Sequence, residues 1–440
     1  MNLISRPVAP RTPYYVSRTT HPIYKIEIMK NTIIIVLLLF AASCSNNPGA
    51  VKSASGNDEN RFFTIDLEKA LGNKQLMNLS QVASDVEYIK LETGKDCMVR
   101  PVVYYFFTDS MVLVQNFDHI LKFSREGRFL QRIGTSGRGP GEIDLIRIMS
   151  VIPEKRVIAV QKNSQRELLF FSFEGNFRKT VDFEPHFFHV KVLPDGKYVS
   201  YDPGSVGNEK YTFCLLSEKW DTLSAVENYT KWVSQPASVM IMVGWPEFEP
   251  FYFSRNTLHV KAMYNDTIYN LRQDKFYPEY FIDLGKYKLP EELRPERLGA
   301  AQFQKFRDNG GNYYFAIVHG VAGKVFLTAH SYSDANPLKY VLCDRLKNEQ
   351  TLLTDKGGVS TGFVNDWDGG IDFWPVGSIS EKKIFMPVNA MDLRKELENI
   401  RSGKKQVKFP GRQKELLKLI SELEETDNPV IMVVTLKQDF

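Results

Sequence analysis

Short runs of apolar and β-branched residues recur along most of the chain, and polar turns separate them. The unit is clearest at residues 121–142, where residues 121–123 and 129–133 are rich in strand-forming side chains. Gly127 lies in the polar turn between them and can supply the positive φ that a tight hairpin needs. The pattern predicts a β-hairpin followed by a glycine-rich loop at residues 134–142.

The hairpin pattern returns along the chain. Residues 171–177 repeat residues 123–129 at an offset of 48 residues, and weaker copies begin near Cys214, Lys261 and Tyr340. Repetition at about 40 to 50 residues, with four short strands in each unit, is the signature of a β-propeller. One twisted four-stranded sheet cannot bury both of its faces, whereas sheets packed around an axis bury them against one another. We therefore expect an all-β, six-bladed propeller over residues 61–440.

Two segments near the C-terminus follow the helical period instead. Residues 391–400 and 414–424 are both expected to be helices, and the second places its apolar side chains on one face. Gly403 and Gly411 break the pattern between them. Residues 290–306 also look helical at both ends. Residues 430–436 form an apolar run after Pro429, and we expect this strand to close the ring, with a small helical insertion before it.

The N-terminal sequence predicts where in the cell the protein is located. Lys30 precedes the apolar run 31–43, which has the length of a signal-peptide core and is too short to span a bilayer. Residues 40–44 end in Cys44 and resemble a bacterial lipobox, in which the cysteine receives the lipid. We interpret residues 1–43 as an over-extended start plus a lipoprotein signal peptide. The polar residues 44–60 are expected to form a flexible tether, with the outer membrane as the destination.

Charge and cysteine content narrow the range of functions that the sequence allows. The formal charge of +4 arises near the N-terminus, because the chain without residues 1–43 has 51 basic and 51 acidic side chains. A neutral domain argues against nucleic acid as the main partner, because that binding depends on phosphate neutralisation. Cys97, Cys214 and Cys343 have no neighbour at metal-ligand spacing, so buried free thiols or one disulfide are expected.

Three motifs carry a resemblance to a known group. They are the glycine loop at residues 137–142, the segment 265–269, and Asn428 and Pro429 before the last strand. Together they resemble the six-bladed β-propeller lipoproteins of Bacteroidota, which are related in architecture to the NHL-repeat propellers. The resemblance covers residues 61–436. It implies binding of proteins, glycans or nucleic acids, and in a few NHL-type propellers metal-dependent lyase chemistry.

The best candidate for a ligand-binding loop combines carboxylates and indoles, namely Asp366, Trp367, Asp368, Asp372 and Trp374. Exposed tryptophan beside aspartate suits stacking on a sugar. Paired carboxylates could also serve a glycosidase. Three aspartates could hold Ca²⁺, but Ile371 occupies the glycine position of a calcium loop and no glutamate closes it, so we predict no metal. A plain turn with buried aromatics is the remaining alternative.

Other candidates are weaker. His186 and His189 are three residues apart, a spacing that puts them on opposite faces of a strand and makes a poor chelate. The loop 134–142 lacks the Gly-Lys-Ser/Thr ending of a phosphate loop, so a turn between blades is expected. Residues 245–253 are aromatic and acidic, and they either line the propeller mouth or form a blade strand.

These observations favour a lipid-anchored envelope propeller that binds a glycan or a protein without catalysis and without a cofactor. The alternative is a glycan lyase or hydrolase with its site at the propeller axis. An enzyme would need convergent acids and bases with perturbed pKa values at that axis, whereas a binding platform needs aromatic and hydrogen-bonding groups.

Overall fold

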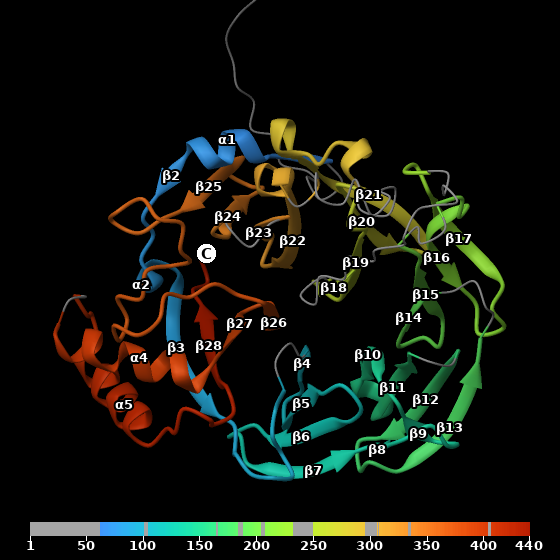
Figure 1. Cartoon of the computed structure of the whole chain (residues 1–440), viewed down its shortest axis with the longest axis horizontal. Coiled ribbons are helices and arrows are strands. Elements are labelled where there is room, and N and C mark those ends of the chain that lie inside the picture. Colours follow the sequence, from blue (N-terminus) through green and yellow to red (C-terminus); the bar gives the residue numbers. More distant parts are fainter. Residues whose placement is uncertain are drawn as a thin grey trace, which may run out of the picture. The chain divides into compact units, whose positions relative to one another are not determined.

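The computed structural model describes residues 62–100, 104–163, 166–183, 188–203, 207–231, 250–294, 306, 308–332, 336–403 and 406–440. Contacts divide the chain into two units, and the second, Asp58–Phe440, contains all of these residues. This second unit is a six-bladed β-propeller, as the repeat pattern predicted (Figure 1). The expected signal peptide, Cys44 and most of the tether lie outside the described residues.

Blades 1 to 3 are four-stranded antiparallel sheets, with strands in the order of the sequence. Their first strands, β4, β10 and β14, lie nearest the central axis (Figure 1). The strands are, for blade 1, β4 (Tyr104–Phe107), β5 (Met111–Gln115), β6 (Ile120–Ser124) and β7 (Phe129–Ile133); for blade 2, β10 (Ile146–Ile152), β11 (Val157–Lys162), β12 (Glu167–Ser172) and β13 (Phe177–Asp182); and for blade 3, β14 (His189–Val192), β15 (Tyr198–Tyr201), β16 (Tyr211–Leu216) and β17 (Thr222–Glu227).

Blades 4 and 5 each gain a fifth, outer strand from the start of the folded chain. β1 (Phe63–Asp66) pairs in parallel with β21, and β2 (Lys74–Gln75) pairs in parallel with β25. Helix α1 (Leu67–Gly72) joins β1 to β2, so this segment straps the two blades together along their outer edge. The blade strands are β18 (Phe251–Ser254), β19 (Thr257–Lys261), β20 (Thr267–Arg272) and β21 (Lys275–Asp283), followed by β22 (Tyr314–Val321), β23 (Lys324–Ser331), β24 (Lys339–Asp344) and β25 (Glu349–Leu353).

Blade 6 closes the ring with strands from both ends of the folded unit. It consists of β26 (Gly377–Ser380), β27 (Lys383–Val388), β28 (Val430–Leu436) and β3 (Ala83–Lys90). The expected closing strand is therefore confirmed, and its N-terminal partner is β3, which follows helix α2 (Leu79–Val82). The helical insertion is also confirmed, because α4 (Ala390–Arg401) and α5 (Pro410–Ser421) lie between β27 and β28.

Short elements complete the described unit. Two-residue strands β8 (Thr135–Ser136) and β9 (Glu142–Ile143) pair in parallel within the glycine loop. The 3₁₀ turns are η2 (Pro153–Lys155), η3 (Gly285–Tyr287), η4 (Glu291–Leu293) and η6 (Gly310–Asn312). Most of the segment 290–306 that was expected to be helical lies outside the described residues.

The hairpins between the third and fourth strands share a bulge in blades 1 to 3. In each, the second residue of the fourth strand has no partner across the hairpin: Leu130, Arg178 and Leu223. An unpaired extra residue turns its side chain away from the blade, which explains why Leu130 is 42% exposed. The repeat expected near Lys261 lies at a different position in its blade. It joins the second and third strands of blade 4, whereas the others join a third and a fourth strand.

The core lies between the blades. One apolar cluster combines Leu113 and Ile120 of blade 1 with Ile158, Val160 and Leu169 of blade 2, and all five are fully buried. Each such side chain contributes roughly 1.5–3 kcal/mol by leaving water. The packing confirms the reason for expecting a propeller, since each sheet buries its faces against its neighbours.

Cys97, Cys214 and Cys343 are buried free thiols, as one of the two sequence alternatives predicted. No helix within the described part of the chain is both long enough and apolar enough to cross a membrane.

Candidate functional site

A cavity of about 820 Å³ lies between blades 4 and 5. Its wall includes residues from three hairpin turns, β18–β19, β22–β23 and β24–β25, together with Arg272 at the end of β20, next to the β20–β21 turn. The outer strand β1 adds Phe62, Phe63 and Thr64 to the wall. We call this cavity the arginine pocket, after Arg255, Arg272 and Arg345. Its volume falls within the range of small-molecule sites, about 300–1,000 Å³.

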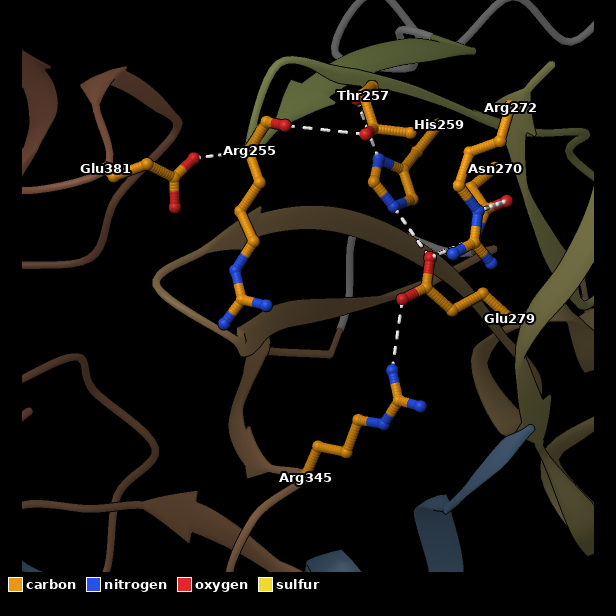
Figure 2. A network of polar contacts seen from close by, with 8 residues as sticks. All are labelled: Arg255, Thr257, His259, Asn270, Arg272, Glu279, Arg345 and Glu381. Carbon is orange, nitrogen blue, oxygen red and sulfur yellow. Dashed lines mark hydrogen bonds and ion pairs between the residues drawn. The ribbon is translucent and has the colours of Figure 1, made fainter. Parts of the chain in front are cut away.

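Glu279 organises the pocket. Its carboxylate accepts hydrogen bonds from His259 Nε2 at 2.8 Å, from Asn270 Nδ2 at 2.7 Å and from Arg345 Nη1 at 3.1 Å (Figure 2). His259 and Asn270 are direct neighbours across β19 and β20 of blade 4, whereas Arg345 comes from the β24–β25 turn of blade 5. One carboxylate therefore joins two strands of its own blade to the next blade.

A β-bulge at Glu279 sets the direction in which its side chain points. Ile268 pairs with Tyr280 and Tyr269 pairs with Pro278, which leaves Glu279 without a partner in β20. In blades 1 to 3 the bulge lies at the second residue of the fourth strand, whereas here it lies farther along. Pro278 has no N–H to give to the ladder, so the pairing is weakened beside the bulge. The displaced bulge turns the carboxylate of Glu279 toward His259, Asn270 and Arg345.

The carboxylate of Glu279 is ionised over the whole physiological range. Burial raises its pKa, but the hydrogen bonds from His259 and Asn270 and the charge of Arg345 outweigh burial and bring the pKa to about 2. Glu279 is therefore a fixed negative charge that orients its donors. It is a poor general acid or base near pH 7, because its pKa is far from that pH.

Arg255 lies at the inner edge of the pocket, in the β18–β19 turn, with a left-handed φ of 49°. Glu381 of the β26–β27 turn accepts hydrogen bonds from the backbone N–H groups of Arg255 and Ala322, and so holds together turns of blades 4, 5 and 6 (Figure 2). The guanidinium of Arg255 lies over Gly323, where a Cβ would come within 2.9 Å of Nη2. The absence of a side chain at Gly323 therefore makes room for this guanidinium.

Positive charge predominates on the wall. Among the residues that the structure describes, the lining contains four cationic side chains, Arg255, Arg272, Lys324 and Arg345, and one carboxylate, Glu279. Lys324 pairs with Asp344 at 2.8 Å, and Arg345 pairs with Glu279. Arg272 Nε donates to the neutral Asn270 Oδ1 at 2.9 Å. Counted over the described lining residues, positive side chains outnumber negative ones, which favours an anionic ligand.

Aromatic side chains form another part of the wall. The ring of Tyr252 stacks on His259, with centroids 4.9 Å apart and planes 9° apart. Its hydroxyl is buried and has no hydrogen-bond partner among the residues that the structure describes. Gly320 leaves room for this ring, because a Cβ there would lie 3.2 Å from Tyr252. At the outer lip, Phe62 is 49% exposed and Leu346 is 79% exposed.

The predicted aspartate loop lies elsewhere, between blades 5 and 6. Asp366 accepts hydrogen bonds from Ser80 N at 2.8 Å and Ser80 Oγ at 2.6 Å. Asp368 is 1% exposed and accepts from Tyr88 Oη at 3.0 Å. Asp372 accepts from Asn365 N at 2.9 Å. The structure thus gathers the three carboxylates in one loop, where they fasten the loop to itself and to neighbouring segments.

The tryptophans of that loop are buried, as the alternative of a turn with buried aromatics predicted, and the expectation of exposed rings is wrong. Trp367 packs against Phe409, and Trp374 donates from Nε1 to Thr328 Oγ1 at 2.8 Å. Burial between blades and helices gives these large rings more contact than the surface could. Asp366 and Asp372 still line a second cavity of about 590 Å³. Ligand binding by this loop therefore stays a prediction.

The remaining candidates fall into three groups. His186 and residues 245–249 lie outside the described residues, while β18 shows that the end of the aromatic segment is a blade strand. His189 lies on β14 and stacks on Tyr201, and burial lowers its pKa to about 3. The glycine loop is a turn between blades 1 and 2, in which Glu142 accepts from Gly139 N at 2.8 Å.

Within the described ranges, no group of three or more His, Cys, Asp or Glu side chains is arranged to hold a metal ion.

Sequence reasoning missed the arginine pocket. Arg345 is 66 residues from Glu279, and Phe62 is farther still, so no local motif connects them. Arginines in hairpin turns are common on any surface. Pro278 inside a strand was the one local signal, since proline in a strand marks an edge or a bulge.

Comparisons with known proteins support the fold. A candidate exported protein of Bacteroides fragilis is 15% identical, with a TM-score of 0.65, over 86% of this chain and 100% of its own. A member of the DUF4221 family from Bacteroides vulgatus is 11% identical, with a TM-score of 0.42, over 81% and 97%. The similarity to the first structure shows the shared fold. The similarity to the second, at a TM-score of 0.42, is too low to add to this conclusion.

Curated proteins give no match to the sequence. A family described as a domain of unknown function, DUF4934, matches residues 62–435.

Proposed function

We propose that this chain, which belongs to the DUF4934 family, is a binding module that takes an anionic ligand in the arginine pocket. The observation that carries the proposal is the composition of the described part of the wall, where four cations and one carboxylate line a cavity of about 820 Å³. Arginine presents a planar set of donors that matches carboxylate, sulfate or phosphate oxygens in pairs.

The construction of the pocket supports binding over catalysis. Glu279 is held ionised by its donors, and it is the one carboxylate among the described lining residues. Its partners are already in place through hydrogen bonds within and between blades, so a ligand meets oriented groups and little binding energy is lost to ordering them.

A calorimetric titration of the full chain in mild detergent tests the proposal. Citrate and inorganic sulfate serve as simple anions, and a neutral sugar such as maltotetraose serves as the uncharged probe. We expect heat of binding for the anions, a weaker affinity at high salt, and a loss of binding in Arg255→Ala. Equal behaviour of Arg255→Ala and the unchanged chain would contradict the proposed site.

We also propose that the module lies in the bacterial cell envelope, anchored by a lipid on Cys44. The signal-like run at residues 31–43 and the polar stretch 44–60 support this location. The shared fold with a candidate exported protein of Bacteroides fragilis is consistent with it. A lipid at Cys44 would leave the propeller on a polar tether at the outer membrane, where glycan or protein ligands are available.

A further inference from the structure

We infer that the ligand of the arginine pocket is an acidic saccharide, that is, a sugar chain bearing carboxylate or sulfate groups. The inference rests on the proposed anion-binding function and adds the chemical class of the ligand. Three features of the wall lead to it: the cations, the uncharged polar groups between them, and the aromatic rings at either end.

The acid group is assigned to the inner end of the pocket. The guanidinium of Arg255 lies over Gly323, on the boundary between blades 4 and 5. The backbone N–H of Arg255 is held by Glu381, which fixes the turn that carries the side chain. A carboxylate or sulfate beside this guanidinium would gain charge-assisted hydrogen bonds.

The uncharged polar groups suit the hydroxyls of a sugar. Thr64, Ser254, Thr257, Asn270 and Asn348 contribute hydroxyl and amide groups to the wall. Tyr252 also lines the cavity, and its hydroxyl is buried and has no hydrogen-bond partner within the described part of the chain. An unpaired buried donor costs free energy, so a ligand oxygen that accepts its hydrogen bond would recover that cost.

The aromatic rings suit the flat, apolar faces of sugar rings. Phe62 is 49% exposed at the lip, close to the exposed side chain of Leu346. Deeper in the wall, Phe63 and Tyr280 meet edge to face with centroids 6.2 Å apart. A purely inorganic anion would make no use of these surfaces, whereas a sugar chain would cover them while its acid group meets Arg255.

Phosphate esters fit the wall less well than carboxylates or sulfates on a sugar. The pocket is lined by strand ends and hairpin turns, with no helix among its lining residues. The N-terminus of a helix is the usual backbone cradle for a phosphate. The side chains supply the recognition here, and arginine recognises the flat carboxylate in two parallel hydrogen bonds.

The test is calorimetric titration of the full chain in mild detergent with tetragalacturonate, with a chondroitin 4-sulfate disaccharide and with maltotetraose. We expect at least one acidic saccharide to bind and the neutral one not to bind. Arg255→Ala should weaken binding at least about tenfold, the usual effect of losing a hydrogen bond to a charged group. Tyr252→Phe should weaken it about fivefold and leave the fold intact, since only a hydroxyl is removed.

Arg156→Ala is the matched control. Arg156 has the same left-handed backbone, with a φ of 51°, in the corresponding turn of blade 2, and it pairs with Glu174 far from the pocket residues. This variant should bind as the unchanged chain does. Binding that Arg156→Ala weakens as much as Arg255→Ala would overturn the assignment, because it would reflect charge in general.

The outcomes separate the two levels of the proposal. Binding of citrate or sulfate that depends on Arg255, without binding of either acidic saccharide, would overturn the saccharide inference and leave the anion site standing. No binding of any anion would overturn both. Carboxylated and sulfated probes tested separately show which acid group the pocket takes.

Discussion

Arg345 of blade 5 donates to Glu279 of blade 4 at 3.1 Å, across the boundary that the arginine pocket occupies. This ion pair is largely buried, with 15% of each side chain exposed. The same carboxylate orients His259 and Asn270, so Glu279 couples the stability of the blade boundary to the shape of the pocket. Substitutions here should therefore change both stability and binding.

Glu279→Gln should lower the free energy of unfolding at pH 7 by about 2–3 kcal/mol, because it leaves buried donors facing a weaker acceptor. The pKa of about 2 lies below the ordinary value of 4.5. The stabilisation by Glu279 is therefore complete above about pH 4.5 and is lost as the pH falls toward 2. Denaturant titrations from pH 7 to pH 3 should show the gap between the two proteins narrowing with acid.

Glu174→Gln is the control for that prediction. Glu174 also has a pKa lowered to about 2 by its hydrogen bond from Arg156, but 54% of its side chain is exposed to solvent. Water screens such a pair, so we expect little change in stability. An equal loss in both variants would contradict the role given to burial at Glu279.

Gly323→Ala should impair the pocket by moving Arg255. The new Cβ would lie 2.9 Å from Arg255 Nη2, and the residue has a φ of +77°. Gly358→Ala is matched in backbone strain, with a φ of +81°, but its Cβ would meet nothing within 4 Å. Both variants should lose about 1 kcal/mol of stability. Anion binding should fall in Gly323→Ala alone, and parallel loss in both would argue against steric displacement.

His319, on the innermost strand of blade 5, should make the propeller sensitive to mild acid. Burial lowers its pKa to about 4 from 6.5, so the folded state holds the ring neutral. The unfolded state takes up the proton first, and stability should fall as the pH drops from about 6.5 to 4. His319→Asn should remove up to about 3 kcal/mol of this loss of stability between pH 6.5 and pH 4 in denaturant titrations. Data at pH 7.5, where the ring is neutral in both the folded and the unfolded state, supply the baseline. An unchanged pH dependence of stability in His319→Asn would show that His319 is not its cause.

Asp368→Ala should destabilise the loop between blades 5 and 6. It removes the acceptor for Tyr88 Oη at 3.0 Å, Asn365 Nδ2 at 2.9 Å and Gly370 N at 3.0 Å. Three unsatisfied donors predict a loss of about 3 kcal/mol in thermal or denaturant unfolding. Asp109→Ala, in an exposed turn, should be neutral. Weakened saccharide binding in Asp368→Ala at unchanged stability would instead favour the ligand-binding interpretation of this loop.

Cys44→Ser should abolish lipid attachment in the native host. Cells labelled with an alkyne analogue of palmitate should yield a labelled protein from the unchanged chain and none from the variant. Cys97→Ser is the control, because Cys97 is a buried thiol within the propeller. Label retained by Cys44→Ser would contradict the lipobox interpretation.

Local patterns were enough to predict the architecture. The polar turn at Gly127 and its copy at Gly175 are both left-handed hairpin turns, with φ of 90° and 85°. Their spacing predicted the blades, and the apolar run at residues 430–436 predicted the closing strand. Alternating side chains and turn glycines act over a few residues, so a single sequence displays them directly.

The site was decided by tertiary structure. Glu279 reaches Arg345 only because the ring places blades 4 and 5 side by side, and Phe62 reaches the pocket only because β1 crosses to β21. Tertiary structure also decided between exposed and buried rings at Trp367 and Trp374, because the space between blade and helices was not visible in the sequence. The sequence by itself determined the blades and their turns, whose causes are local. The pocket depends on contacts between distant segments, and only the closed ring brings those segments together.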